Sequence, residues 1–150
     1  MFRDISPLLA DGQALFATIN LLVAKAKDAD VIVGPDARGF LFGTPVAACL
    51  KKPFVMIRKP GKLPGPVIKK TYNLEYGTNV LEMQQDAIKP NQKIVIIDDL
   101  LATGGTTRAI VEMIEEIGAQ VIKVLFVIEL LSLNGRQKYH GINTESLIQF

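Results

Sequence analysis

Cysteine is nearly absent from this sequence, in which Cys49 is the only one. A single cysteine excludes an internal disulfide framework and a cysteine-rich zinc site, and it suits a reducing cytosol. Long hydrophobic runs are absent too, because the longest, VLFVIELLSL, is interrupted by Glu129 and is too short to span a bilayer. The first residues, MFRDISPLL, place an acid and a proline where a signal peptide has a clean apolar core. We therefore expect a soluble, cytoplasmic protein that is not bound to a membrane.

An excess of charge of one sign is also missing. The formal net charge is +2, which is too small to indicate binding to nucleic acid. A chain of 150 residues is long enough to bury one substantial core, so we expect a single domain over residues 1–150. The basic residues are unevenly distributed, since the segment 51–70 contains no acid but holds Lys51, Lys52, Arg58, Lys59, Lys62, Lys69 and Lys70.

Helical and strand patterns alternate along the chain. Apolar residues at three- and four-residue intervals predict an amphipathic helix over 11–30, with Asp11 as its cap. The segments that follow predict a buried strand (31–34), a mostly buried helix (39–52), a strand (54–58), a proline- and glycine-rich loop (59–70) and an extended segment (71–77). Beyond them we expect a buried strand (93–98), a helix (105–117) that stops at Gly118, a strand (119–130) and a last short strand (146–150). This alternation predicts an α/β fold with a mostly parallel sheet flanked by helices.

The stretch VIIDDLLATGGTTRA, residues 95–109, ends a predicted strand on two adjacent carboxylates, Asp98 and Asp99. The glycines Gly104 and Gly105 permit a positive φ and leave backbone N–H groups uncovered by side chains. Threonine hydroxyls flank them, and the helix that follows presents the positive end of its dipole, so the turn has the properties of a phosphate cradle. In open parallel sheets, ligands bind beyond the carboxyl ends of the strands, where this turn lies.

The two carboxylates would repel a phosphate that sat beside them. We therefore expect Asp98 and Asp99 to lie one step upstream of the cradle, where they accept hydrogen bonds from the vicinal hydroxyls of a ribose. A diol site beside a phosphate cradle predicts a ribose 5-phosphate unit as ligand. The turn lacks the Gly-Lys-Ser/Thr ending of nucleoside-triphosphate loops. The alternative is an ordinary helix start after a strand, with two solvated aspartates.

Three further features have a functional and a structural interpretation. Arg38 follows the first predicted sheet strand, where its guanidinium suits phosphate oxygens, or it forms a structural ion pair with Asp36. The basic segment 58–70 is either a lid that closes over an anion and excludes water, or a solvated charged loop. Glu75 is either a proton donor or acceptor for a bound ligand, or a surface glutamate. His140, the only histidine, lies in a weakly patterned tail, and we assign it no role.

Five segments carry a resemblance to a known family, and they occur in that family's order and spacing. They are FRDISP (2–7), ARGFLFG (37–43), RKPGKLPG (58–65), YNLEYG (72–77) and DDLLATGGT (98–106). Together they resemble the type I phosphoribosyltransferases and, more narrowly, the branch that acts on adenine. The resemblance covers essentially the whole chain. It implies the phosphoribosyltransferase fold and transfer of a phosphoribosyl group from phosphoribosyl pyrophosphate to adenine, with AMP and pyrophosphate as products.

The resemblance also implies roles for individual residues. It implies catalytic roles for Glu75, Arg38 and Arg58; ribose binding by Asp98 and Asp99; 5-phosphate binding by Ala102, Thr103, Gly104, Gly105 and Thr106; pyrophosphate binding by Arg38, Arg58, Lys59 and Lys62; and adenine binding by Phe2, Arg3 and Leu100. We expect Mg²⁺ as cofactor, held mainly by the oxygens of the substrate, and a homodimer. Family members begin upstream of the position that matches Met1, which implies a shortened N-terminus and a reduced hood over the base.

Two other functions stay open on the sequence. One is a phosphoribosyltransferase for hypoxanthine, guanine, xanthine or orotate, although FRDISP and LEYG are not the pattern of the oxopurine enzymes. The other is a protein that binds phosphoribosyl pyrophosphate without turnover, either as a regulator or as a shortened, inactive homologue.

Overall fold

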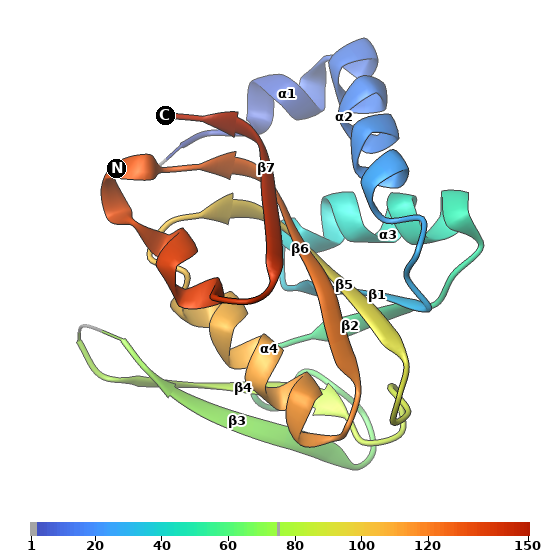
Figure 1. Cartoon of the computed structure of the whole chain (residues 1–150), viewed down its shortest axis with the longest axis vertical. Helices are drawn as coiled ribbons and strands as arrows, with labels where there is room; N and C mark the ends of the chain where they lie inside the picture. Colours follow the sequence, from blue (N-terminus) through green and yellow to red (C-terminus); the bar gives the residue numbers. More distant parts are fainter. Residues whose placement is uncertain (1–2, 75) are drawn as a thin grey trace.

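The computed structural model describes residues 3–74 and 76–150, and its centre is a five-stranded parallel sheet (Figure 1). The strand order is β2-β1-β5-β6-β7, and every neighbouring pair is parallel. The strands are β1 (Val31–Pro35), β2 (Phe54–Ile57), β5 (Lys93–Leu101), β6 (Gln120–Glu129) and β7 (Asn143–Gln149). The helices are α1 (Ser6–Ala10), α2 (Gly12–Lys25), α3 (Arg38–Leu50) and α4 (Gly105–Glu116), with two short 3₁₀ helices, η1 (Leu131–Leu133) and η2 (Gly135–Tyr139). The predicted α/β fold with a parallel sheet is confirmed.

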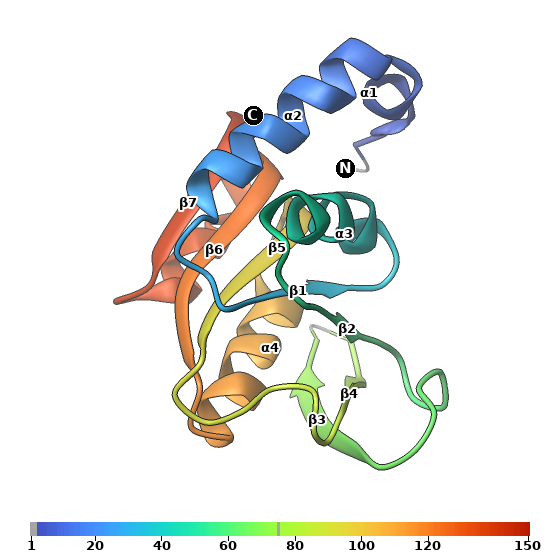
Figure 2. The same cartoon turned by 90° about the vertical axis from the view of Figure 1, so that its right-hand side faces the viewer.

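Each face of the sheet has its own buried core, because successive strand residues point to opposite faces. In β5, Ile94 and Ile96 pack with Ile110 and Met113 of α4, while their neighbours turn to the other face, which α2 and α3 cover. Figure 2 shows α2 and α3 together on one side of the sheet and α4 on the other. Burial on both faces explains why these strands are continuously apolar rather than alternating.

An antiparallel hairpin stands apart from the main sheet, formed by β3 (Val67–Asn73) and β4 (Thr78–Gln84). The prediction of a loop over 59–70 is therefore wrong at its end, since β3 begins at Val67. β3 includes the first three residues of the extended segment predicted for 71–77 and ends at Asn73. The prolines and glycines on which the loop prediction rests all lie before residue 67. Residues 67–73 form a strand because Ile68 and Tyr72 pack against the core and because β4 pairs with the whole segment. The partner strand β4 was not predicted.

The remaining boundaries agree with the prediction to within a few residues. The side chain of Asp11 caps α2 by accepting hydrogen bonds from two backbone N–H groups, both at 3.0 Å. That helix ends at Lys25, earlier than the predicted 30, and α4 ends just before Gly118, which has φ 83°. β5 runs to Leu101 rather than stopping at Asp98.

The N-terminal segment returns to the end of the chain. The guanidinium of Arg3 lies 4.1 Å from the ring centre of Phe150, a cation–π contact between the two ends. Among the described residues, every helix is too short or too polar to cross a bilayer.

Candidate active site

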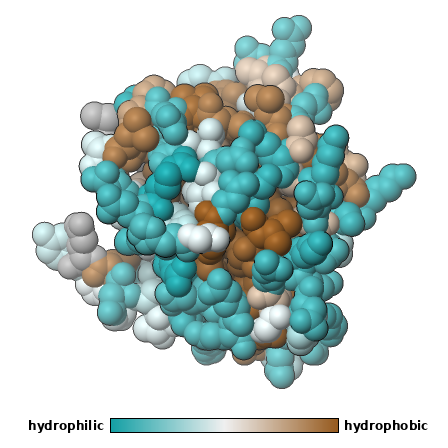
Figure 3. All heavy atoms as spheres, in the orientation of Figure 1, coloured by the Kyte–Doolittle hydropathy of each residue, from teal (hydrophilic) through white to brown (hydrophobic). Residues whose placement is uncertain are grey.

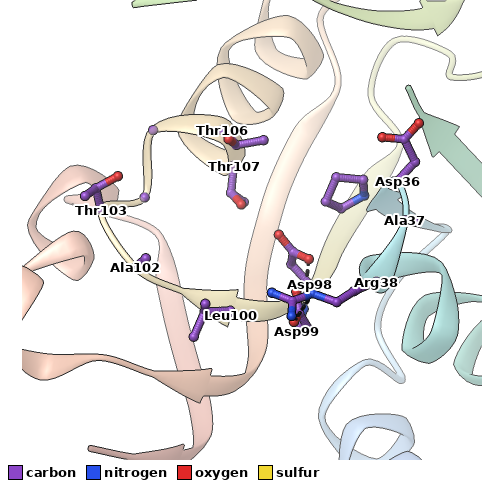
Figure 4. Close-up of a pocket in the computed structure, with 13 residues that line it drawn as sticks. Asp36, Ala37, Arg38, Asp98, Asp99, Leu100, Ala102, Thr103, Thr106 and Thr107 are labelled. Carbon is purple, nitrogen blue, oxygen red and sulfur yellow. Dashed lines mark hydrogen bonds and ion pairs between the residues drawn. The ribbon is translucent and has the colours of Figure 1, made fainter. Parts of the chain in front are cut away.

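The acidic pair lies inside the last part of β5, and α3 brings an arginine to it. The backbone N–H of Asp99 donates to Oδ1 of Asp98 at 2.8 Å, so the first carboxylate folds back over the strand. Arg38 is the first residue of α3, and its Nε lies 2.8 Å from Oδ2 of Asp99 (Figure 4). The alternative of a structural ion pair between Arg38 and Asp36 is therefore wrong, because Arg38 pairs with the acidic pair instead.

Burial and charge perturb the first carboxylate of this pair. Removal from water raises the pKa of Asp98 well above its usual value, and the negative charge of Asp99 raises it further. The start of α3 is packed tightly over the same group: a Cβ on Gly39 would lie 2.7 Å from Pro35 Cδ and 3.2 Å from Oδ1 of Asp98. Glycine at position 39 therefore permits the helix to approach the acids.

The turn after β5 leads directly into the N-terminus of α4. Gly104 is the N-cap residue, has φ 78° and has no side chain with which to cap the helix. The N–H groups of the first helical turn therefore remain available to an anion, and the helix dipole favours one there. Pocket residues are contributed by the end of β1 and the start of α3 as well as by this turn. A pocket of about 280 Å³ is lined by Pro35, Asp36, Ala37, Arg38, Asp98, Asp99, Leu100 and residues 102–107.

The helix η2 supports this turn from behind, a contact that sequence reasoning missed. The hydroxyl of Tyr139 donates to the carbonyl of Gly104 at 2.9 Å, and the Tyr139 ring lies against Phe126. A Cβ on Gly135 would lie only 2.2 Å from the carbonyl oxygen of Ala102, so the two segments touch through their backbones. This tail has no periodic apolar pattern, and an isolated glycine and tyrosine are the only signs of a packed segment in its sequence.

The basic segment folds toward the end of β1. Nε of Arg58 lies 3.2 Å from Oδ2 of Asp36, and its Nη1 donates to the carbonyl of Lys62 at 3.3 Å. Asp36 thus pairs with the arginine of the basic segment rather than with Arg38. A second cavity, of about 460 Å³, adjoins the first, since both are lined by Pro35, Asp36 and Thr106. Its other walls come from the basic segment and the hairpin: Lys59, Pro60, Tyr72, Thr78, Asn79, Val80 and Leu81.

The structure brings most of the predicted site residues to one place. Arg38, Asp98, Asp99, Leu100 and the turn Ala102–Thr106 all line the first pocket, and Lys59 lines the cavity beside it. Lys62 is exposed and lines neither cavity, and Arg3 lies against Phe150. The predictions for Phe2 and Glu75 fall outside the described residues.

Comparisons with known proteins agree with this geometry. The phosphoribosyl transferase domain family matches residues 3–148, which defines the class of the protein. A curated relative named adenine phosphoribosyltransferase, from Mycoplasmopsis pulmonis, is 62% identical over 148 residues, which are 99% of this chain and 87% of the relative. Another of that name, from Agathobacter rectalis, is 47% identical and covers 100% of this chain and 87% of its own length. The chain belongs to the adenine phosphoribosyltransferase family.

Solved structures of the same family superpose closely. The adenine phosphoribosyltransferase of Thermoanaerobacter pseudethanolicus has a TM-score of 0.94 at 47% identity, covering 99% of this chain and 88% of that chain. The enzyme of Saccharomyces cerevisiae, solved with adenine and an imino-altritol bisphosphate, has a TM-score of 0.91 at 36% identity, covering 97% and 86%. The fold is therefore that of this family.

Proposed function

We propose that this protein transfers the 5-phosphoribosyl group of phosphoribosyl pyrophosphate to adenine, giving AMP and pyrophosphate, as in purine salvage. The observation that carries the proposal is the continuous strand, turn and helix from Asp98 to Thr107, which sets a carboxylate pair beside an uncapped helix N-terminus in one pocket. Relatives that share the whole length of this architecture carry the name of this activity. The adenine phosphoribosyltransferase of Trypanosoma brucei was solved with AMP, pyrophosphate and ribose-5-phosphate.

The two halves of the pocket suit two parts of one substrate. The backbone N–H groups and hydroxyls of residues 102–106 bind the 5-phosphate, helped by the dipole of α4. Asp98 and Asp99 accept hydrogen bonds from the ribose hydroxyls. The carboxylates lie in the strand, upstream of the turn, so their charge does not sit where the phosphate binds. Arg38 compensates the charge of Asp99 and adds a cation to the same pocket.

The basic residues of the segment 58–62 suit the pyrophosphate end. In the reaction, the bond from ribose C1 to pyrophosphate breaks, its electron pair leaves with pyrophosphate, and N9 of adenine attacks C1 and loses its proton. The transition state then resembles an oxocarbenium ion, as in glycoside hydrolysis. Arg58, Lys59 and Lys62, with Arg38, stabilise the negative charge of the departing group. Glu75 accepts or donates the proton at the purine ring.

The base site lies beside the acidic pair. Leu100 follows Asp99 and lines the pocket, where its side chain packs against one face of adenine. Phe2 and Arg3 cover the base from the N-terminal segment. The neighbouring Asp4 lies within electrostatic reach of Arg38, because its pKa is lowered chiefly by hydrogen bonds from Ser6 and also by the charge of Arg38.

Magnesium fits the donor set as an ion that the substrate largely holds. The described residues include no group of three or more acidic, histidine or cysteine side chains that could chelate a metal. Asp98 and Asp99 are oxygen donors of the kind that Mg²⁺ accepts, but one is engaged by Arg38, so most ligands must come from phosphate and ribose oxygens. The ion would neutralise pyrophosphate charge there.

We further propose a cytoplasmic homodimer. Large apolar side chains remain exposed on the monomer, among them Phe16 and Leu21 of α2 and Leu131 of η1. Figure 3 shows that hydrophilic residues cover most of one face while apolar residues gather near its centre and along its upper edge. Such surface suits a partner subunit. Light scattering would give about twice the chain mass of 16.4 kDa.

Product analysis tests the proposed function. Purified protein with phosphoribosyl pyrophosphate, Mg²⁺ and adenine, hypoxanthine or xanthine should form AMP and little IMP or XMP. IMP as the main product would overturn the choice of base. Binding of phosphoribosyl pyrophosphate without any AMP would favour the inactive homologue.

Beside the wild type, Asp99→Asn and Glu75→Gln should each lose most of kcat/KM, about a hundredfold, because each removes a charged partner of the substrate. If both variants keep the full rate, the assigned roles are wrong.

A further inference from the structure

One buried carboxylate has no part in the mechanism above. Glu82, in β4 of the hairpin, is 3% exposed, as deeply buried as the residues of the core around it. Burial of a carboxylate is costly unless charged or hydrogen-bonding partners compensate it. Its partners therefore indicate what the residue is for.

Among the described residues, the partners of Glu82 belong to the basic segment or to the hairpin itself. Oε2 accepts a hydrogen bond from the backbone N–H of Gly61 at 3.0 Å, and Oε1 lies 3.3 Å from Nζ of Lys69. Its own backbone exchanges two hydrogen bonds with Arg58, at 3.0 and 2.8 Å. The side chain and main chain of one residue thus hold both ends of the turn 58–61.

This turn is the part of the chain from which the pyrophosphate cations project. Gly61 has φ 77°, with nothing within 4 Å of the position of a Cβ, so glycine is needed there for the turn and not for space. Arg58 extends from it to Asp36 and to the carbonyl of Lys62, and Lys59 lines the cavity next to the acidic pair. If the turn moves, all of these cations move with it.

We propose that Glu82 is a positioning residue that holds the turn 58–61 so that Arg58 and Lys59 face the pyrophosphate end of the site. This role rests on the proposed function. Glu82 acts only through the turn: it lines neither cavity of the site, and its side chain points to Gly61 and Lys69. A charged acceptor suits the Gly61 N–H because charge-assisted hydrogen bonds are shorter and stronger than neutral ones.

Two substitutions separate the parts of this role. Glu82→Leu removes both side-chain contacts, while Glu82→Gln keeps the volume and one acceptor but loses the charge. Lys69→Met is the matched control, because it removes the ion pair at Oε1 and leaves the Gly61 bond in place. For each we would measure kcat, KM for both substrates, and the Kd of pyrophosphate and of AMP by calorimetry.

We expect the Glu82 variants to lose affinity at the pyrophosphate end of the site and to keep it at the adenine end. Glu82→Leu should raise KM for phosphoribosyl pyrophosphate and Kd for pyrophosphate about tenfold, and Glu82→Gln about threefold, as for the loss or weakening of one hydrogen bond to a charged group. KM for adenine and Kd for AMP should stay within twofold, and Lys69→Met should match the wild type. If Glu82 only stabilised the fold, its substitution would raise both KM values and both Kd values together.

Two results would overturn the proposal: wild-type pyrophosphate affinity in both Glu82 variants, or an equal loss of affinity for AMP. If Glu82→Leu does not fold, the Gln variant decides alone, and hydrogen exchange must then show faster exchange in residues 58–62 than in the wild type. The binding measurements need no turnover. A wild type that binds pyrophosphate but makes no AMP would refute the proposed function and leave this test intact.

Discussion

The fold disfavours the charged form of the Asp98 carboxyl group. Its pKa in the folded protein lies well above the usual value because burial and Asp99 disfavour its charge. A raised folded pKa stabilises the fold fully only below the ordinary pKa of an aspartate, and this contribution is lost as pH rises through the folded value. The charged form of Asp98 therefore lowers the stability of the fold at the pH values at which it is populated.

The upward direction of the pKa shift of Asp98 predicts how the variant Asp98→Asn behaves. The variant should melt at a higher temperature than the wild type at neutral pH without ligand, and the difference should shrink as pH falls toward the ordinary pKa of an aspartate. Its kcat/KM should fall, because a carboxylate that accepts from the ribose is gone. Thermal melts over a pH series, with Asp86→Asn as an exposed control, measure this. A difference that does not change with pH would refute the assigned pKa shift.

The residues of the site that are contiguous in the chain were the part of it that the sequence could predict. Asp98, Asp99 and the Thr-Gly-Gly-Thr turn are contiguous, so their proximity needs no knowledge of the fold. The partner of Arg38 was not accessible in this way. Arg38 is far from Asp99 in sequence and near Asp36, and only the pairing of β1 with β5 shows which carboxylate it meets.

At the scale of elements, the phosphate turn depends on a second element behind it. Tyr139 in η2 is 3% exposed, and its burial raises the pKa of its hydroxyl, so the group remains a donor to Gly104 throughout the working pH range. This hydrogen bond fixes the carbonyl of Gly104, the N-cap residue of α4, which has a left-handed conformation. The orientation of the first N–H groups of α4 therefore rests partly on Tyr139.

Tyr139→Phe tests this support by removing one atom and keeping the ring against Phe126. Loss of a neutral hydrogen bond costs about 0.5–1.5 kcal/mol, so affinity for AMP and ribose 5-phosphate should fall about three- to tenfold. Affinity for adenine alone should not change. Calorimetry gives these values, and Tyr76→Phe, at a side chain 94% exposed, is the matched control. Unchanged AMP affinity would mean that η2 packs against the turn without orienting it.

The hairpin shows why elements were harder to predict than the turn. In β4 the buried residues Leu81, Glu82 and Met83 are consecutive, which is not the alternation of an ordinary half-exposed strand. β3 has two adjacent lysines, and one of them, Lys70, pairs with Glu112 and Glu116 on α4. These strands form because tertiary partners complete them, and such partners leave no periodic pattern in the sequence.

At the scale of the whole molecule, the site is a junction of three parts: the end of β1 with α3, the turn into α4, and the hairpin with its basic segment. The first cavity lies between the first two parts, and the second extends to the third. A ligand that fills both cavities ties all three together. Phosphoribosyl pyrophosphate should therefore stabilise the fold more than AMP does, by mass action on a larger set of contacts.

Magnesium enters this arrangement through the ligand. Because the described residues offer no group of three metal-binding side chains, Mg²⁺ alone should leave the melting temperature of the unliganded protein unchanged, and EDTA should do the same. With phosphoribosyl pyrophosphate present, EDTA should remove most of the ligand-induced rise in melting temperature, since the uncompensated pyrophosphate charge then faces Asp36 and the acidic pair. The rise caused by AMP should survive EDTA. Thermal melts with each ligand, with and without EDTA, measure all of this. A metal-dependent melting temperature in the absence of ligand would show instead that the protein itself holds the ion.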